Sequence, residues 1–139
     1  MCGIAGFTSF YKKNYNIKET MANMLTSIAH RGPDASGDYF EDKVNLGHRR
    51  LSIVDLETGA QPLHSEDGNL ILVFNGEIYN FVELRNQLKK QGFQFRTSSD
   101  TEVIIHMYRK YGLDFVKHLN GMFAIALWDK NSEQLIIAR

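Results

Sequence analysis

Apolar residues spaced three and four positions apart predict the helices of this chain. The first such pattern covers residues 17–30 and stops in residues 31–34, where a glycine and a proline both disfavour a helix. A second helix is expected within residues 80–92, which begin with an asparagine suited to an N-cap and end with glycine. Residues 97–112 predict a third helix, with N-cap candidates in front and a glycine behind, and residues 113–119 predict a short fourth one.

Short apolar runs predict the strands. Residues 1–7 are rich in glycine and small apolar side chains and predict a short strand buried on both faces. Residues 39–54 predict two strands around an acidic turn, and residues 70–74 predict a buried strand. The Asn-Gly pair that follows this run indicates a turn when it is taken by itself. Residues 93–95 alternate as a half-buried strand does, and residues 122–138 predict a hairpin.

Polar residues, glycines and prolines gather in residues 8–16, 31–38 and 55–67, which are expected to be loops. No internal repeat, low-complexity segment or linker divides the sequence, so residues 1–139 are predicted to be one domain. The order of strand, helix, strands, helices and strands predicts an α/β arrangement in which helices pack over a mixed, largely antiparallel sheet.

Composition narrows the functional classes. Lys plus Arg and Asp plus Glu each number 16, so the net charge is zero and lacks the basic excess of a nucleic-acid-binding protein. A single cysteine cannot form an internal disulfide bond. Neither a signal peptide nor an apolar run of membrane-spanning length is visible, so we expect a cytoplasmic protein that binds neither nucleic acid nor membrane.

Metal and nucleotide sites find little support. The 5 histidines show no short ligand spacing, and a thiolate metal site would need more cysteines than this chain has. The acidic residues between positions 34 and 42 do not match a calcium-binding loop. No glycine motif that cradles phosphate is present. We therefore expect no metal ion and no cofactor in this chain.

Cys2 carries the most specific chemistry. Removal of Met1 would leave Cys2 with a thiol and a free α-amine, which places a nucleophile beside a proton acceptor on one residue. An α-amine titrates near ~7.7–8.0 and a thiol near ~8.5, so proton transfer between them is nearly balanced. By itself Cys2 fits a small buried apolar residue equally well.

Other polar residues have both a functional and an ordinary interpretation. Asn75 and Gly76 could supply donors to an oxyanion or form a simple turn. Arg50 could bind a carboxylate through its guanidinium fork or lie in solvent, and its neighbour Arg49 should point to the opposite face of the strand. Asp100 could hold an ammonium group or only cap a helix. Glu77 is similarly ambiguous, and the loop at residues 31–34 fits either a flap over a pocket or a tight connection.

Seven motifs in order along the chain resemble the class II glutamine amidotransferase domain, the N-terminal-nucleophile type. They are Cys2-Gly3-Ile4, His30-Arg31-Gly32-Pro33-Asp34, residues 47–55 (GHRRLSIVD), Gly59-Ala60-Gln61-Pro62, Asn75-Gly76-Glu77-Ile78-Tyr79-Asn80, residues 99–104 (SDTEVI) and Asn120-Gly121-Met122-Phe123-Ala124. The sequence of residues 31–34 and 50–55 is similar to that of glutamine-hydrolysing asparagine synthetases in particular.

The resemblance implies an α+β fold, the N-terminal-nucleophile αββα sandwich of two antiparallel sheets between helical layers. It also implies L-glutamine as the substrate. Cys2 would be the nucleophile, with its own α-amine as base, and Asn75 and Gly76 would form the oxyanion hole. Arg50 would bind the α-carboxylate, with help from the backbone of Leu51, Ser52, Ile53 and Val54. Glu77 and Asp100 would bind the α-amino group.

In the family the chain continues into further strands and a synthetase domain in cis, which binds ATP and Mg²⁺ and uses the ammonia to make asparagine. We therefore expect residues 1–139 to be the N-terminal part of such a protein, with an incomplete sheet whose unpaired edge invites association. The sequence leaves open whether the protein forms a homodimer. ATP and Mg²⁺ are implied for that further domain only.

Three alternatives remain from the sequence. An amidotransferase of the same family could feed ammonia to a different acceptor. Another N-terminal-nucleophile hydrolase could cleave a different amide, but it would not need Arg50 and Asp100 together. The chain could also be an inactive fragment or an interaction module, as retention of Met1 would indicate.

Overall fold

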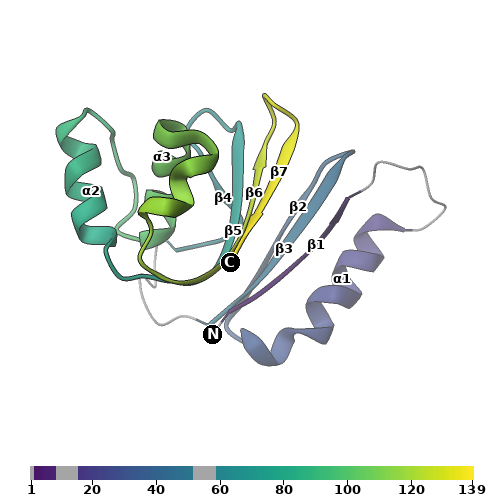
Figure 1. Ribbon diagram of the computed structural model, residues 1–139. Helices are drawn as coiled ribbons and strands as arrows, with labels where there is room; N and C mark the ends of the chain where they lie inside the picture. The colour runs from purple at the N-terminus through teal and green to yellow at the C-terminus, as the bar shows by residue number, and fades with distance from the viewer. Residues whose placement is uncertain (1, 9–15, 52–58) are drawn as a thin grey trace.

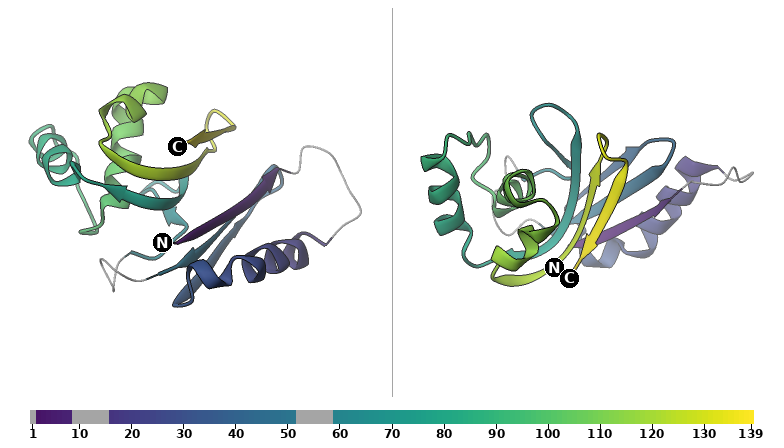
Figure 2. Two further views of the ribbon diagram at one scale, coloured as in Figure 1. Left: turned by 60° about the horizontal axis from the view of Figure 1, so that its bottom comes forward. Right: turned by 45° about the horizontal axis from the view of Figure 1, so that its top comes forward.

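Two antiparallel sheets face each other, and helices cover the outer surface of each sheet (Figure 1). The computed structural model describes residues 2–8, 16–51 and 59–139. The views in Figure 2 separate the layers: helix α1 (Ile17–Ser27) lies outside the first sheet, and helices α2 (Phe81–Lys90) and α3 (Asp100–Tyr111) lie outside the second. This αββα order is the fold that the resemblance implied.

The first sheet has the strand order β1-β3-β2. Its strands are β1 (Gly3–Thr8), β2 (Ala35–Phe40) and β3 (Val44–Arg50). Helix α1 (Ile17–Ser27) begins at Asn16, whose side chain accepts a hydrogen bond from the backbone of the first turn, and it lies across the outer face. A 3₁₀ turn, η1 (Ala29–Arg31), leads from α1 to β2.

The second sheet has the order β4-β5-β6-β7. Its strands are β4 (Leu63–His64), β5 (Leu70–Ile78), β6 (Gly121–Asp129) and β7 (Gln134–Ala138). The helical layer over it consists of α2 (Phe81–Lys90), α3 (Asp100–Tyr111) and the 3₁₀ helix η2 (Gly112–His118). Both long helices begin and end close to the predicted residues.

Strand β5 divides its side chains between two cores. Leu70, Leu72 and Phe74 pack with the helices α2 and α3, whereas Ile71 and Val73 pack against the first sheet. This division follows from the period of two in a strand, which sends successive side chains to opposite faces. A continuous apolar run is therefore what a strand buried on both faces requires.

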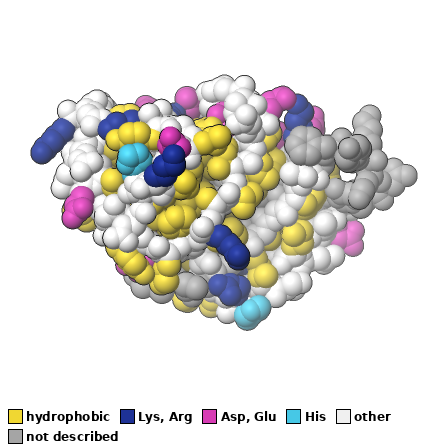
Figure 3. Space-filling model, in the orientation of Figure 1, with side chains coloured by type: hydrophobic (Ala, Val, Ile, Leu, Met, Phe, Trp, Pro, Cys, Tyr) yellow, Lys and Arg dark blue, Asp and Glu magenta, His cyan; other side chains and the backbone are white. Residues whose placement is uncertain are grey.

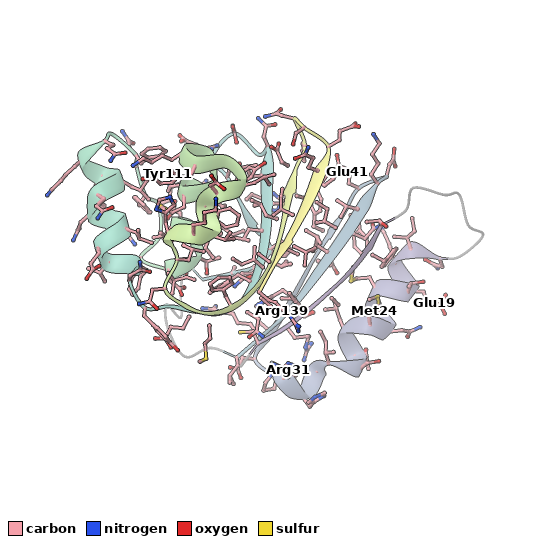
Figure 4. The ribbon with its side chains drawn as sticks, in the orientation of Figure 1. Glu19, Met24, Arg31, Glu41, Tyr111 and Arg139 are labelled. Atoms are coloured by element: carbon pink, nitrogen blue, oxygen red, sulfur yellow. The ribbon has the colours of Figure 1, made fainter. Side chains whose placement is uncertain are left out.

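The core between the sheets is anchored by a carboxylate at one end. Val44 and Leu46 of β3 meet β5 and β6 there, and Trp128 of β6 is 2 % exposed. The indole Nε1–H of Trp128 donates to Glu41 Oε2 at 2.6 Å, and the Tyr39 hydroxyl donates to the same oxygen at 2.6 Å. Glu41 thus ties the first sheet to the second (Figure 4).

Helix α1 lies close to β3 because Gly47 has no side chain. A Cβ atom at Gly47 would lie 2.6 Å from the Met21 sulfur and 3.0 Å from Leu25 Cδ2. Met21 and Leu25 are the buried residues of this helix. The small residue in β3 therefore sets the distance between α1 and the first sheet.

Several predicted boundaries were wrong. Residues 35–38, expected to be a loop, belong to β2, because the strand pairs with β3 from Ala35↔Arg50 to Phe40↔Asn45. The Asn-Gly pair at 75–76 is no turn, since β5 continues to Ile78 in register with β6. Residues 93–95 lie outside any strand, and β1 is an edge strand that is only partly buried.

Two further expectations changed in detail. The Asn80 side chain makes no capping hydrogen bond to α2; it accepts from Asn120 N at 2.9 Å and donates to His118 O at 3.0 Å instead. Asn80 therefore joins the start of α2 to the turn before β6. The strand expected up to residue 54 ends at Arg50, and residues 52–58 lie outside the described residues, as do residues 9–15 of the first loop.

The surface shows apolar side chains over the strands as well as charged ones (Figure 3). Strand β7 forms an edge of its sheet, and its Ile137 is 69 % exposed. The association that we expect of such an edge stays a prediction. Within the described ranges, no helix has the length and apolarity needed to cross a membrane.

Candidate active site

One cavity of about 260 Å³ opens at the end of the two sheets where β1 begins. Residues of both sheets and of the start of α3 line it. They are Cys2, Arg50, Leu51, Gly59, Gln61, Phe74, Asn75, Gly76, Glu77, Phe81, Ser99, Asp100, Thr101 and Met122. The cavity thus collects every predicted site residue that the structure describes, from segments far apart in the sequence.

Cys2 lies directly before β1 and is held from two sides. Its sulfur accepts from Leu51 N at 3.3 Å and lies 3.7 Å from Leu51 O, while Arg31 Nε donates to the Cys2 carbonyl at 3.1 Å. Figure 4 places Arg31 at this end of the molecule, opposite Glu41. These contacts fix both the thiol and the backbone of Cys2.

The loop at residues 31–34 is a tight connection. A Cβ atom at Gly32 would lie 2.3 Å from the Arg49 carbonyl carbon and 2.5 Å from Arg50 N, so the loop backbone lies directly on β3. Asp34 N donates to Arg50 O at 3.0 Å. Of the two alternatives left by the sequence, the described structure fits the connection rather than a flap.

Arg50 and Arg49 lie on opposite faces of β3, as predicted. Arg50 shares its face with Leu46 and His48, which look toward the second sheet, and it lines the cavity. Arg49 lies on the α1 side and does not line the cavity. The strand period therefore selects Arg50 as the guanidinium that a ligand in the cavity can meet.

Asn75 and Gly76 occupy β5 at the cavity wall. Asn75 lines the cavity, and its Oδ1 is buried without a hydrogen-bond partner among the described residues. Gly76 has φ +156°, and a Cβ atom there would lie 2.1 Å from Met122 O. Only glycine fits this position.

Asp100 is the first residue of α3 and lines the cavity together with Glu77. Ile78 N donates to Asp100 Oδ2 at 3.0 Å. Burial raises the pKa of Asp100 above its ordinary value, with a smaller contribution from the charge of Glu77, while the hydrogen bonds from Ile78 and Thr101 oppose the rise. A cation between the two carboxylates would relieve this cost, so the arrangement suits an ammonium group.

Sequence reasoning missed several residues of the wall, Gln61 above all. Gln61 stands in one of the quoted motifs, but its place in a turn-rich segment, between Ala60 and Pro62, indicated only a turn. Ser99 was one of the expected N-cap candidates, and it does cap α3 by accepting from Thr101 N at 3.1 Å. Of the predicted backbone contributors, Leu51 lines the cavity, and Ser52, Ile53 and Val54 lie outside the described residues.

In the part of the chain that the structure describes, no group of three or more His, Cys, Asp or Glu side chains could hold a metal ion. The cavity offers one guanidinium, two carboxylates, two side-chain amides and a thiol. This set matches a ligand with a carboxylate, an ammonium group and an electrophilic carbon.

Comparison with known proteins finds a family and several relatives that match this chain over its full length. The profile of the family described as "Glutamine amidotransferase domain" matches residues 1–139. "Asparagine synthetase [glutamine-hydrolyzing] 1" of Bacillus subtilis is 43% identical over 141 residues, which are 100% of this chain and 22% of that protein. "Amidase chry2" of Gibberella zeae is 45% identical over 151 residues, again 100% of this chain and 22% of that protein.

Two solved structures share the fold. A glutamine phosphoribosylpyrophosphate amidotransferase from B. subtilis, complexed with ADP and GMP, superposes with a TM-score of 0.52 at 32% identity and covers 65% of this chain and 22% of that one. A structure titled as the allosteric regulatory enzyme of purine biosynthesis gives a TM-score of 0.56 at 30% identity over 65% of this chain and 22% of that one. The chain thus spans only a small part of these relatives.

Proposed function

Because this chain belongs to the glutamine amidotransferase domain family, we propose that it hydrolyses L-glutamine to glutamate and ammonia, with Cys2 as the nucleophile. The observation that carries the proposal is the joint presence of Cys2, Arg50, Asn75 and Asp100 in one cavity. An amino acid has one carboxylate and one ammonium group, and the cavity offers a partner for each.

Binding would orient the substrate by its two charges. The guanidinium N–H groups of Arg50 donate to the α-carboxylate, and the carboxylates of Asp100 and Glu77 accept from the α-ammonium group. The side chain of glutamine then extends toward Cys2 and β5. Such fixed charges hold the carboxamide carbon next to the sulfur, which converts a bimolecular encounter into an oriented one.

The chemistry proceeds through a thioester. The Cys2 sulfur attacks the carboxamide carbon while the α-amine of Cys2 takes the thiol proton, and the resulting oxyanion accepts hydrogen bonds from the Asn75 amide and the Gly76 N–H. The C–N bond breaks, the α-amine returns its proton to the leaving nitrogen, and ammonia departs. Water then cleaves the thioester and releases glutamate.

The mechanism requires removal of Met1. While Met1 is attached, the nitrogen of Cys2 is an amide and cannot accept the proton. Met1 itself lies outside the described residues. Protein with Met1 retained should therefore release no glutamate, and intact-mass analysis distinguishes the two forms.

The test of the proposal is glutamate release from glutamine by protein shown by mass to begin at Cys2. We expect release by the wild-type protein and none by Cys2→Ala, with unchanged thermal unfolding as the control for folding. Arg50→Ala should weaken glutamine binding strongly. Hydrolysis of simple amides that survives Arg50→Ala, together with no preference for glutamine, would instead support a different N-terminal-nucleophile hydrolase.

The use of the ammonia is a proposal about the full-length protein. We propose asparagine formation with ATP and Mg²⁺ in a synthetase domain in cis, in line with the relatives named asparagine synthetases. A different acceptor is the second candidate, because relatives named amidases match this chain at similar identity. The full-length protein would be given aspartate and glutamine labelled in the amide nitrogen, and the appearance of labelled asparagine would decide between the two acceptors.

A further inference from the structure

Strand β5 loses its neighbour just before the site. Strand β4 pairs with β5 only through Leu63↔Leu72 and His64↔Ile71. Extended back by two residues, this register would place Gln61 opposite Phe74, but β4 begins only at Leu63. Among the described residues, the edge of β5 that faces β4 therefore has no strand partner at Phe74, and Asn75 and Gly76 follow immediately.

Two side chains take the place of that missing strand. Gln61 Oε1 accepts from Phe74 N at 2.6 Å, and His48 Nε2 lies 3.1 Å from Phe74 O. A carbonyl oxygen only accepts, so His48 must carry a proton on Nε2 and donate. His48 is 1 % exposed and comes from the facing sheet, whereas Gln61 comes from the segment before β4.

These contacts hold two successive peptide planes. The N–H of Phe74 belongs to the peptide that joins it to Val73, and its carbonyl belongs to the peptide that joins it to Asn75. Because peptide groups are planar, holding both fixes the direction in which the chain enters Asn75. In a regular antiparallel ladder, N–H groups two residues apart point to the same edge, so Gly76 is expected to direct its N–H where Phe74 does.

We propose that His48 and Gln61 are positioning residues that set the geometry of the oxyanion donors at Asn75 and Gly76. The inference rests on the proposed function and goes beyond it by assigning roles to residues outside the predicted site. His48 does not line the cavity, so it acts only through Phe74. Donors to an oxyanion are effective when they are held in place before the charge develops, and small displacements are costly.

The first test replaces Gln61 with methionine, which keeps the length of the side chain and removes the acceptor. We expect Gln61→Met to lower kcat for glutamine by roughly 10- to 100-fold, as a displacement near 1 Å does elsewhere. The affinity for the product glutamate, measured by calorimetry, should not change, since glutamate binds through Arg50 and Asp100. Gln61→Glu, which keeps an acceptor, should recover much of the loss.

A second pair of variants addresses His48. His48→Leu removes the donor to Phe74 O, and His48→Gln restores a side-chain N–H. Activity should fall with leucine and rise again with glutamine, as judged by kcat. If His48→Leu does not fold, the Gln61 variants still decide the question.

Ser65→Ala is the matched control. Ser65 Oγ accepts from Leu70 N at 2.9 Å, so a side chain also holds the edge of β5 there, but at the far end of the strand. Ser65→Ala should lower stability and leave kcat unchanged. An equal loss of kcat in Ser65→Ala and Gln61→Met would mean that the strand matters only for stability, and would overturn the proposal.

A transition-state analogue separates positioning from direct binding. The γ-aldehyde analogue of glutamine forms a tetrahedral adduct with a cysteine thiol, and its oxygen then occupies the oxyanion position. Its affinity should fall in Gln61→Met by the same factor as kcat. An equal fall in glutamate affinity would show that Gln61 touches the substrate directly, which overturns the positioning role. If the wild-type protein releases no glutamate and does not bind the aldehyde, the proposed function fails and the inference fails with it.

Discussion

His48 should make the stability of this protein sensitive to mild acid. Burial lowers its pKa from 6.5 to about 4; the contact with Phe74 O opposes this effect, and the charge of Arg50 adds to it. Between about pH 4 and pH 6.5, His48 is protonated in the unfolded chain and neutral in the folded chain. The free energy of unfolding is therefore fully maintained above about pH 6.5 and falls as the pH drops toward 4.

The size of the loss follows from the two pKa values. Each tenfold difference in proton affinity corresponds to about 1.4 kcal/mol, so the gap from 6.5 to about 4 corresponds to about 3 kcal/mol. That is a large part of the roughly 5–15 kcal/mol by which a domain is typically stable. Most of it should be lost by about pH 4.5.

The assay is urea unfolding at several pH values between about 7.5 and 4.5, with wild-type protein beside His48→Gln. Glutamine cannot titrate, so the variant should lack this part of the pH dependence. His64, whose pKa is also lowered by burial, contributes equally to both proteins. Glu102, with its pKa lowered from 4.5 to about 2, acts below this range. Parallel profiles for the two proteins would refute the assignment of a neutral, buried His48.

Three further predictions concern the site and the core. Arg50→Lys should raise KM for glutamine roughly 10- to 100-fold in steady-state glutaminase assays, because an ammonium group cannot replace the two-pronged guanidinium contact. Gly76→Ala should abolish activity and lower the melting temperature, because its Cβ would lie 2.1 Å from a carbonyl oxygen of β6. The control is Gly92→Ala, which has φ +91° and no atom within 4 Å of the added Cβ, so it should cost only backbone strain. Trp128→Phe removes the donor to Glu41 and should lower the free energy of unfolding by about 1.5–3 kcal/mol in urea titrations; an unchanged value would mean that Glu41 does not join the sheets.

The helices were predictable because their signals are local. Ser99 before α3 and Gly112 after it set the ends of that helix, and the structure has both at the expected places, with Gly112 at φ +58°. The prediction that Arg49 and Arg50 point to opposite faces also needed only the strand period. Each of these statements depends on residues within a few positions of one another.

The errors arose where distant segments decide the structure. Asn75 and Gly76 have the local preference of a turn, but their pairing with β6, which is more than forty residues away in sequence, keeps them in a strand. Residues 35–38 become a strand for the same reason, because β3 pairs with them. The roles of Gln61 and His48 depend on the place where the pairing between β4 and β5 stops, and no pattern in the sequence marks that place.

The alternation of side chains along the strands explains why the site lies where the core ends. Ile4 and Val73 pack in the core between the sheets. Cys2, two residues before Ile4, and Asn75, two residues after Val73, keep the same alternation and line the cavity. The same rule brings Arg50 to the cavity from β3. The apolar core therefore fixes the facing strands, while polar residues at the next inward positions form the cavity. A substitution that slips one strand by a single residue would turn these polar side chains away from each other, so the register of the sheets is itself a requirement of the site.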